Sequence, residues 1–156
     1  VIQHAVKFHE AETGQKVETV VTIQPTTPFI QASDIDACLS ALQNDPELSA
    51  AVSVSPIHER PEWMMQRSDQ SGVMKPIMNT VFTGEAGVSQ AQDKLYMPNG
   101  GIYATRRSTL FNNNSLYGKH CFGYIMDRLR SVDIDELIDF RLAQTIAEYP
   151  SDFFDN

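Results

Sequence analysis

The sequence has little cysteine, few basic residues and no long hydrophobic run. Its two cysteines, Cys38 and Cys121, lie far apart without metal-ligand spacing, so we expect buried, reduced thiols. No stretch approaches the roughly 20 apolar residues that a membrane span requires. The opening residues, VIQHAVKFHE, lack the basic start and apolar run of a secretory signal. These absences predict a cytoplasmic protein without a membrane partner.

Acidic side chains outnumber basic ones. Asp and Glu total 20 against 12 Lys and Arg, so the 156 residues carry a formal net charge of −8. Binding DNA or RNA through general phosphate neutralisation needs a positive face, so we expect no nucleic-acid partner. A small anionic ligand held by a few local groups is compatible with this charge. With 42% hydrophobic residues, the chain is typical of one folded domain over 1–156.

Hydrophobic periodicity alternates between the helical and the strand type. Helical spacing runs from Ile2 to the stop at Gly14, and a second helical stripe covers 35–42, with Ser33 or Asp34 as its cap. Strands are predicted at 17–23, 51–54, 102–104 and 122–126, and a short helix at 107–111. A closing helix is predicted at 134–148, with these residues facing inward: Leu137, Ile138, Leu142 and Ile146. This alternation predicts an α/β sheet with parallel strands.

Two segments depart from that pattern. From Pro56 to Pro98 the apolar residues have no long period, which favours short antiparallel strands on an arm. Such an arm packs on a second subunit or, equally well, on the same core. At the start, the helical spacing has no Ser, Thr, Asp or Asn before it and no initiator Met. We therefore expect Val1 to lie inside a helix of a longer protein.

Two motifs next to predicted strands offer polar groups to a ligand. Gln24-Pro25-Thr26-Thr27-Pro28 follows a buried strand, where open α/β sheets bind ligands, and its prolines stiffen the backbone. The alternative is an ordinary proline turn. Asn99-Gly100-Gly101 precedes a strand, and its glycines allow a close approach of the backbone to a ligand. The alternative, which is favoured for this motif alone, is a hairpin turn.

The third motif is acidic and runs from Ser131 to Glu136. Residues two apart in an extended segment project to the same side, so Asp133 and Asp135 can present two carboxylates to one cation. Few hard oxygen ligands, completed by water and phosphate, suit Mg²⁺ in a nucleotide site. The alternative is a capping box with Asp133 as N-cap and Glu136 three residues later. Spacing alone does not separate the two interpretations.

In this order, the segments QPTTPF, SDID, NGGIY and RSVDIDELIDF resemble the acylneuraminate cytidylyltransferase family, the CMP-sialic acid synthetases. The resemblance runs from Val1 to about Glu148. It implies a Rossmann-like nucleotide-diphospho-sugar transferase fold, mostly parallel, flanked by helices and incomplete at the N-terminus. It also implies transfer of CMP from CTP to a nine-carbon 2-keto sugar acid of the sialic, legionaminic or pseudaminic type, with release of pyrophosphate. The segment 56–98 then corresponds to the arm that helps to form a homodimer.

The same resemblance implies the roles of individual residues. Asp133 and Asp135 are the expected catalytic and metal-binding residues, which hold Mg²⁺ on the nucleotide triphosphate. The expected substrate-binding residues follow the other two motifs: Gln24, Thr26, Asn99 and Gly100. Among them, Gln24 and Asn99 are expected to contact the sugar acid. A metal and positive groups neutralise the charge on the transferring phosphoryl group, so no covalent nucleophile is required.

The chain also departs from the family pattern. The Gly-, Arg- and Lys-containing phosphate loop is absent, so we expect these 156 residues alone to have little or no transferase activity. The family often has Arg where this chain has Ile30, Ser89 and Met97, which weakens or changes recognition of the acidic substrate. One alternative is therefore a degenerate, non-catalytic sugar-binding or dimerisation module. A weaker alternative is a glycosyltransferase in which Asp133 and Asp135 bind the donor's metal.

Overall fold

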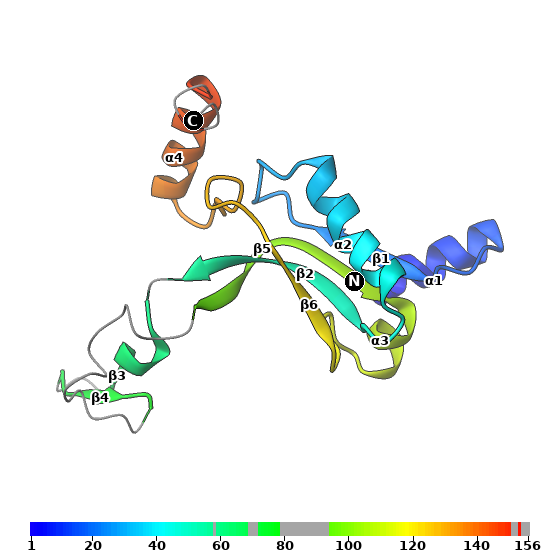
Figure 1. Cartoon of the computed structure of the whole chain (residues 1–156), viewed down its shortest axis with the longest axis horizontal. Coiled ribbons are helices and arrows are strands. Elements are labelled where there is room, and N and C mark those ends of the chain that lie inside the picture. Colours follow the sequence, from blue (N-terminus) through cyan, green and yellow to red (C-terminus); the bar gives the residue numbers. More distant parts are fainter. Residues whose placement is uncertain (58, 69–71, 79–93, 151–152, 154–156) are drawn as a thin grey trace. The chain divides into compact units, whose positions relative to one another are not determined.

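Helices and strands alternate along the chain, as the hydrophobic patterns predict. A computed structural model describes residues 1–57, 59–68, 72–78, 94–150 and 153 (Figure 1). The helices are α1 (Ile2–Thr13), α2 (Ala32–Asn44), α3 (Arg107–Asn112) and α4 (Leu137–Glu148), with a 3-10 turn, η1 (Pro61–Trp63). The strands are β1 (Thr19–Ile23), β2 (Ala50–Ile57), β3 (Met65–Arg67), β4 (Met74–Pro76), β5 (Leu95–Arg106) and β6 (Cys121–Ile125). The predicted α/β class is confirmed.

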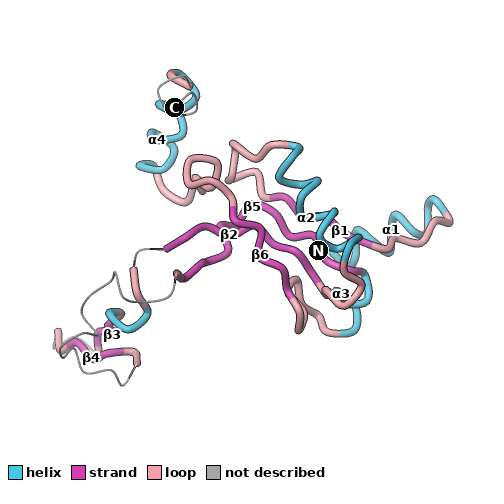
Figure 2. The backbone as a smooth tube through the Cα atoms, in the orientation of Figure 1, coloured by secondary structure: helices cyan, strands magenta, loops and turns pink. Residues whose placement is uncertain are grey.

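The chain divides into two compact units. One comprises Val1–Ser55 with Pro98–Asn156, and the other comprises Pro56–Met97. The second unit contains η1 and the antiparallel pair of β3 and β4, in which Gln66 faces Lys75. The expected short antiparallel strands in this segment are therefore confirmed. Figure 2 distinguishes the strands of both units from the loops that connect them.

The four-stranded sheet of the first unit is mixed. Its strand order is β1-β5-β2-β6, so β1 and β6 are the edges. Strands β2 and β6 run parallel, with Val52 facing Gly123, whereas β1 runs antiparallel to β5, with Val21 facing Ala104. The expectation of parallel strands is thus confirmed for β2 with β6 and wrong for β1 with β5. The reason is that hydrophobic patterns report burial but not the direction of a neighbouring strand.

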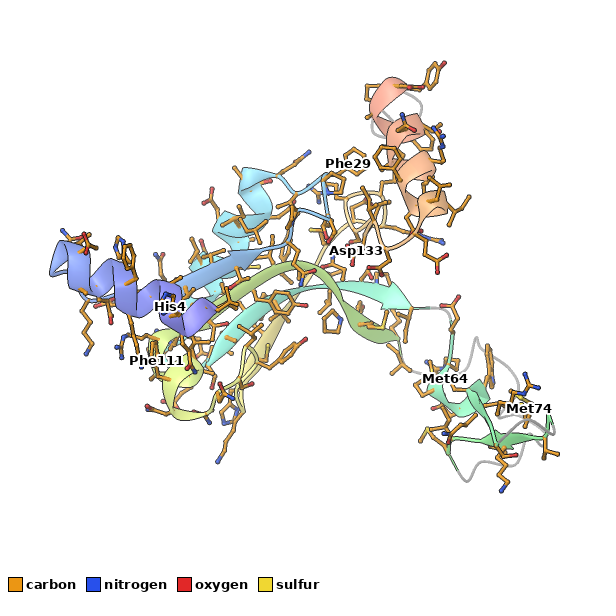
Figure 3. The ribbon with its side chains drawn as sticks, turned by 180° about the vertical axis from the view of Figure 1, so that it is seen from behind. His4, Phe29, Met64, Met74, Phe111 and Asp133 are labelled. Carbon is orange, nitrogen blue, oxygen red and sulfur yellow. The ribbon has the colours of Figure 1, made fainter. Side chains whose placement is uncertain are left out.

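Helix α1 is attached to α3 by an ion pair and a ring contact. Arg107 Nε and Nη2 donate to the two carboxylate oxygens of Glu10 at 2.8 and 2.9 Å. The same guanidinium lies over the ring of Phe111, 4.3 Å from its centroid, and the Lys7 ammonium is 5.6 Å from that centroid. Figure 3 shows Phe111 beside α1. The helix ends where predicted, at Gly14, which adopts φ +69°.

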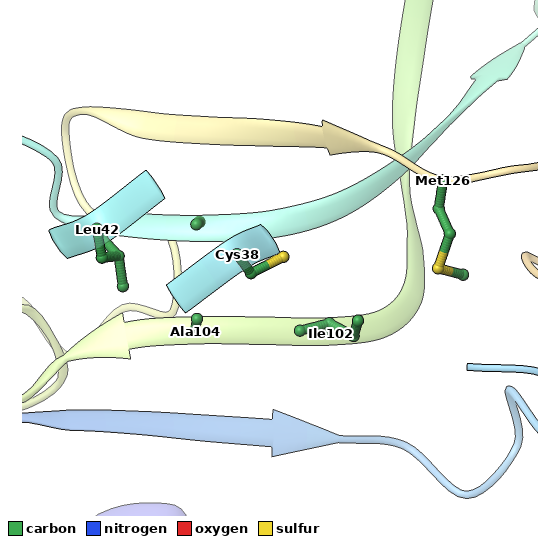
Figure 4. Packing of buried hydrophobic residues seen from close by; sticks show 6 residues of the cluster. Cys38, Leu42, Ile102, Ala104 and Met126 are labelled. Carbon is green, nitrogen blue, oxygen red and sulfur yellow. The ribbon is translucent and has the colours of Figure 1, made fainter. Parts of the chain in front are cut away.

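The main core lies between α2 and the central strands. Cys38 and Leu42 from α2 pack with Ile102 and Ala104 from β5 and with Met126 after β6 (Figure 4). Alanines on the strand surface let the helix approach closely, so the larger side chains fill the space between them. Burial of a side chain such as that of Leu42 contributes about 1.5–3 kcal/mol.

The two cysteines differ in exposure. Cys38 is buried and Cys121 is exposed, and both are free thiols. The expectation of two buried thiols is therefore wrong for Cys121, because this residue opens β6 at the edge of the sheet. Burial raises the pKa of the Cys38 thiol to about 11, with smaller contributions from Asp34 and Cys121. Cys38 is thus an apolar core residue.

Helix α2 begins with a different cap from the predicted one. The N-cap is Gln31, and its backbone N–H donates to Asp34 Oδ2 at 2.9 Å. Asp34 thus occupies the third helical position, and neither Ser33 nor Asp34 is the N-cap. The correction has a simple cause, because a carboxylate at the third position reaches back to the cap N–H as well as a Glu or Gln does.

Helix α4 buries less of its surface than its sequence predicts. It begins at Leu137 rather than at 134, and Leu137 and Ile138 are 71% and 70% exposed. Leu142 is also exposed, whereas Ile146 is fully buried beside Ala143. The prediction of four inward residues is therefore confirmed only for Ile146. The helix packs through a narrow stripe of residues three apart, not through the whole apolar face.

Candidate functional site

Three predicted motifs meet around Gly100. A Cβ atom built on this glycine would lie 2.8 Å from Asp133 Oδ2 and 3.2 Å from Gln24 Oε1. The loop after β1, the middle of β5 and the loop after β6 therefore come together at one point of the first unit. Figure 3 shows Asp133 in this part of the chain. Residues about a hundred positions apart thus present side-chain oxygens to the same small space.

The diglycine motif is a bend inside a strand and not a hairpin turn. Asn99, Gly100 and Gly101 all lie within β5, and Gly100 has φ +78°. A Cβ on Gly101 would lie 3.2 Å from Ser53 Oγ and 3.3 Å from Ile30 Cδ1. The favoured hairpin interpretation is therefore wrong, because the strand continues through the motif. Glycine is required here since side chains from three directions crowd the backbone.

Asp133 has an unsatisfied carboxylate oxygen. Its Oδ1 is buried and has no hydrogen-bond partner among the described residues, while Oδ2 lies beside Gly100. Asp133 does not cap α4, since the N-cap is Glu136 and its backbone N–H donates to Asp139 Oδ2 at 2.8 Å. The capping interpretation of Asp133 is thus wrong. A buried carboxylate oxygen without a donor is costly unless a cation or another donor approaches it.

The second predicted carboxylate lies closer to the solvent. Asp135 is exposed in the turn before α4, and its backbone N–H donates to Asp139 Oδ2 at 3.2 Å. Among the described residues, no group of three or more His, Cys, Asp or Glu side chains is arranged to hold a metal ion. A Mg²⁺ site that has only one or two carboxylate ligands, with phosphate and water as the others, would not form such a group of three side chains. The oxygens of Asp133 and Gln24 are hard donors and fit Mg²⁺ by their chemistry.

The proline loop is joined to both neighbouring segments through its backbone. Gln24 N–H donates to the carbonyl oxygen of Gly101 at 3.2 Å, and Ile134 N–H donates to that of Thr26 at 2.9 Å. Thr27 is buried, and its Oγ1 has no hydrogen-bond partner in the part of the chain that the structure describes. Thr26, the predicted binding residue, therefore holds the acidic loop through its carbonyl. Two adjacent threonines give no sequence signal to distinguish the buried one.

Asn99 uses most of its amide inside the protein. Its Oδ1 accepts from Ser53 Oγ at 2.5 Å and from Gly101 N–H at 3.2 Å, and its Nδ2 donates to Ser131 Oγ at 2.8 Å. The residue is only 7% exposed. The second N–H of this amide makes no hydrogen bond to the residues that the structure describes. Ser131 opens the acidic motif, but the sequence predicted no role for it, and Ser53 belongs to none of the three motifs.

A tyrosine next to the diglycine stays protonated. Burial, together with a hydrogen bond with Tyr117 and the charge of Asp133, raises the pKa of Tyr103 to about 12. The rings of Tyr103 and Tyr117 meet edge to face, with centroids 5.8 Å apart. The hydroxyl of Tyr103 therefore stays protonated over the physiological pH range.

The three positions where the family often has Arg differ in their surroundings. Ile30 packs against the main core, and its Cδ1 approaches Gly101. Met97 is exposed in β5. Ser89 lies outside the described residues. At Ile30 the structure therefore places an apolar group beside the candidate site.

In the part of the chain that the structure describes, no helix has the length and apolar character needed to cross a bilayer.

No family model matches the sequence. The chain is 24% identical to N-acylneuraminate cytidylyltransferase of Escherichia coli over 147 residues, which cover 94% of this chain and 33% of that protein. It is 26% identical to CMP-N,N'-diacetyllegionaminic acid synthase of Legionella pneumophila over 132 residues, covering 84% of this chain and 54% of the relative.

A third relative is post-translational flagellin modification protein B of Campylobacter coli. It is 25% identical over 130 residues, which cover 81% of this chain and 52% of that protein. The chain spans between a third and about half of the length of these curated relatives. The matches extend over most of the chain. The resemblance to the acylneuraminate cytidylyltransferase family is therefore confirmed.

Proposed function

We propose that this chain is part of an enzyme that transfers CMP from CTP to a nine-carbon 2-keto sugar acid and releases pyrophosphate. The observation that carries the proposal is the meeting of Gln24, Gly100 and Asp133 at one point, with a buried carboxylate oxygen left unsatisfied. The names of two relatives, an acylneuraminate cytidylyltransferase and a CMP-legionaminic acid synthase, support the same reaction. Sialic, legionaminic and pseudaminic acids are the candidate acceptors.

The acceptor side of the site consists of neutral polar groups. The Gln24 amide offers a donor and an acceptor, and Asn99 offers its remaining N–H. Gly100 leaves the space that a substrate oxygen needs near these groups. Thr26 keeps the proline loop in place through its carbonyl. Fixed donors of this kind orient the attacking hydroxyl without reorganisation during the reaction.

We assign Asp133 and Asp135 as the residues that would hold Mg²⁺. The unsatisfied Oδ1 of Asp133 supports this assignment, because a divalent cation would satisfy it. When bound, the metal supplies positive charge to the phosphate oxygens of the nucleotide. Asp133 is placed by tertiary contacts, whereas Asp135 is exposed and free to approach a phosphate-bound ion. Both carboxylates act as ligands in this proposal and neither as a nucleophile.

The proposal includes the fold and the assembly implied by the family. We infer a Rossmann-like nucleotide-diphospho-sugar transferase fold and a homodimer formed through the arm 56–98. Support for the arm comes from the exposed large apolar side chains of the second unit: Trp63, Met64, Met65, Val73, Met74, Ile77 and Met78. Met, Trp and other large apolar residues are enriched at interfaces. Light scattering of the purified chain tests this point, and a monomer at micromolar concentration would contradict it.

A non-catalytic sugar-binding module is the second candidate. It is favoured by Ile30, an apolar side chain beside the diglycine where the family often carries Arg. The chain also lacks the family's phosphate loop, so under either proposal we expect slow or no CMP transfer by these 156 residues. Binding of the ligands, rather than turnover, therefore distinguishes the candidates.

The decisive experiment is a titration of the chain with Mn²⁺, in the presence of CTP, and with each of the three sugar acids. The enzyme proposal predicts Mn²⁺ binding that is lost in Asp133→Asn and sugar-acid binding that is lost in Gln24→Ala. The module proposal predicts sugar-acid binding without dependence on Asp133. A folded chain that binds neither Mn²⁺ nor any of the sugar acids would end both proposals.

A further inference from the structure

The loop between β6 and α4 has no regular structure to place its residues. It contains bends and turns from Asp127 to Glu136, drawn as loop in Figure 2. Its first part is a local turn, in which Ser131 N–H donates to the carbonyl oxygens of Asp127 and Arg128 at 3.0 and 3.2 Å. Local bonds of this kind do not fix a loop relative to the sheet. Asp133 therefore depends on long-range contacts for its position.

A fully buried carboxylate lies next to this loop. Asp34 is 0% exposed, and its Oδ1 accepts from the Tyr124 hydroxyl at 2.8 Å. Its Oδ2 accepts from Gln31 N–H at 2.9 Å, and Arg130 Nη1 is 3.3 Å from Oδ1. A charge buried this deeply requires partners on both oxygens. Asp34 thus joins α2 and β6 to the loop that follows β6.

Arg130 is the residue of the loop that contacts Asp34. Besides its ion pair with Asp34, its Nη1 donates to Gln31 Oε1 at 3.1 Å. Its side chain is only 21% exposed, so its charge is partly removed from water. The ion pair with Asp34 and the hydrogen bond to Gln31 together fix the orientation of the guanidinium. A single ion pair on the surface would hold it less firmly. One flank of the loop is thereby fixed to the start of α2.

The other flank is fixed to the sheet. Ser131, the next residue, accepts a hydrogen bond from Asn99 Nδ2 at 2.8 Å. Ile134 N–H then donates to the carbonyl oxygen of Thr26 at 2.9 Å. Three successive long-range contacts therefore enclose Asp133 from both sides. Of these, the contact of Arg130 is the one that involves a buried charge.

Tyr124 provides a second hydrogen-bond donor to the buried carboxylate of Asp34. Burial and its hydrogen bond to Asp34 raise the pKa of the Tyr124 hydroxyl, while Arg130 opposes that rise. The hydroxyl therefore remains a donor to the carboxylate. Without it, Oδ1 of Asp34 would depend on Arg130 alone, so the two donors share one acceptor.

We propose that Arg130, held by the buried Asp34, is a positioning residue that sets the place of Asp133 in the site. It acts through the loop and touches neither nucleotide nor sugar. The inference rests on the proposed function, in which Asp133 is a ligand of Mg²⁺ and its position therefore matters. The contacts of Arg130 with Asp34 and Gln31 lie outside the three motifs.

The test compares Arg130→Gln with Arg107→Gln in the full chain. Arg107 is the matched control, since it makes a bidentate ion pair with Glu10 of α1 and lies in α3, outside the loop. The first readout is amide hydrogen exchange of Ile134, whose N–H is bonded to Thr26. We expect exchange at least tenfold faster in Arg130→Gln and unchanged in Arg107→Gln. Arg130→Lys, which keeps the charge near Asp34, should restore part of the protection.

The second readout is Mn²⁺ affinity in the presence of CTP. We expect Arg130→Gln to weaken it at least tenfold and Arg107→Gln to leave it unchanged. If the unsubstituted chain binds no Mn²⁺, the metal assignment fails, and exchange at Ile134 still decides the positioning role. Equal exchange at Ile134 in the two variants would overturn the inference, even where both lose stability. Tyr124→Phe provides a milder variant of the same cluster in case Arg130→Gln does not fold.

Discussion

Gly100 provides the most direct test of the site, through the substitution Gly100→Ala. The new methyl group would lie 2.8 Å from Asp133 Oδ2 and 3.2 Å from Gln24 Oε1, closer than carbon and oxygen normally approach. The residue also has φ +78°, a conformation that side chains with a Cβ rarely adopt. One substitution therefore combines backbone strain with displacement of a proposed metal ligand.

The chain offers a control that separates these two effects. Gly14 has φ +69°, and a Cβ there would meet no atom within 4 Å. Gly14→Ala thus measures the backbone term alone, which is about 1–2 kcal/mol for an L-residue in the left-handed region. Crowding at Gly100 adds about 1–3 kcal/mol, the usual range for an overfilled site. Because Asp133 Oδ2 is at the end of a side chain, rotation of the carboxylate relieves part of that cost.

The assay has two parts. Thermal unfolding compares both variants with the unsubstituted chain, and each kcal/mol corresponds to roughly 2–4 °C for a chain of this size. Mn²⁺ titration in the presence of CTP then measures the effect on the site. We expect Gly100→Ala to melt several degrees below Gly14→Ala and to bind Mn²⁺ at least tenfold more weakly. Gly14→Ala should bind Mn²⁺ like the unsubstituted chain.

The reasoning would be refuted by equal behaviour of the two variants. Equal melting temperatures would mean that no side chain lies against Gly100. Unchanged Mn²⁺ affinity, together with the expected loss of stability, would mean that Asp133 is close to Gly100 but holds no metal. The first result would contradict the contacts at Gly100, and the second would contradict the role of Asp133 as a metal ligand.

Three further predictions follow from the same contacts. Asp133→Asn should weaken Mn²⁺ binding at least tenfold in a titration and leave the melting temperature nearly unchanged, because the Oδ1 that it replaces has no partner in the described chain. Asp139→Ala should lower the free energy of unfolding by about 1 kcal/mol in urea denaturation, through loss of the cap on Glu136 N–H, without changing Mn²⁺ binding. The hydrogen bond from Arg107 lowers the pKa of Glu10 below its ordinary value of 4.5, so the stabilisation by this pair is present above that pH and disappears as the pH falls through the lowered pKa. Urea denaturation of Glu10→Gln should therefore differ from that of the unsubstituted chain at pH 7 and match it at low pH, whereas a constant difference would contradict this assignment.

Local signals in the sequence were sufficient for most helices and strands. The stop at Gly14, the stripe of Cys38 and Leu42, and the β-branched run of β1 are each decided within a few neighbouring residues. Periodicity and turn residues act over that range, so these elements could be predicted. The resemblance carried by the three motifs also implied binding roles for Gln24, Gly100 and Asp133, and the structure brings these residues close together.

The remaining features depend on tertiary contacts, which no local pattern contains. The diglycine lies inside β5, where Ser53 and Asp133 approach it from segments distant in sequence. Arg130 reaches Gln31 across 99 positions, and Asn99 reaches Ser131 across 32. The sequence by itself thus determined the elements and the residue types of the site. Only the tertiary structure decided which polar groups are already satisfied inside the protein and which, like Asp133 Oδ1, are left for a ligand.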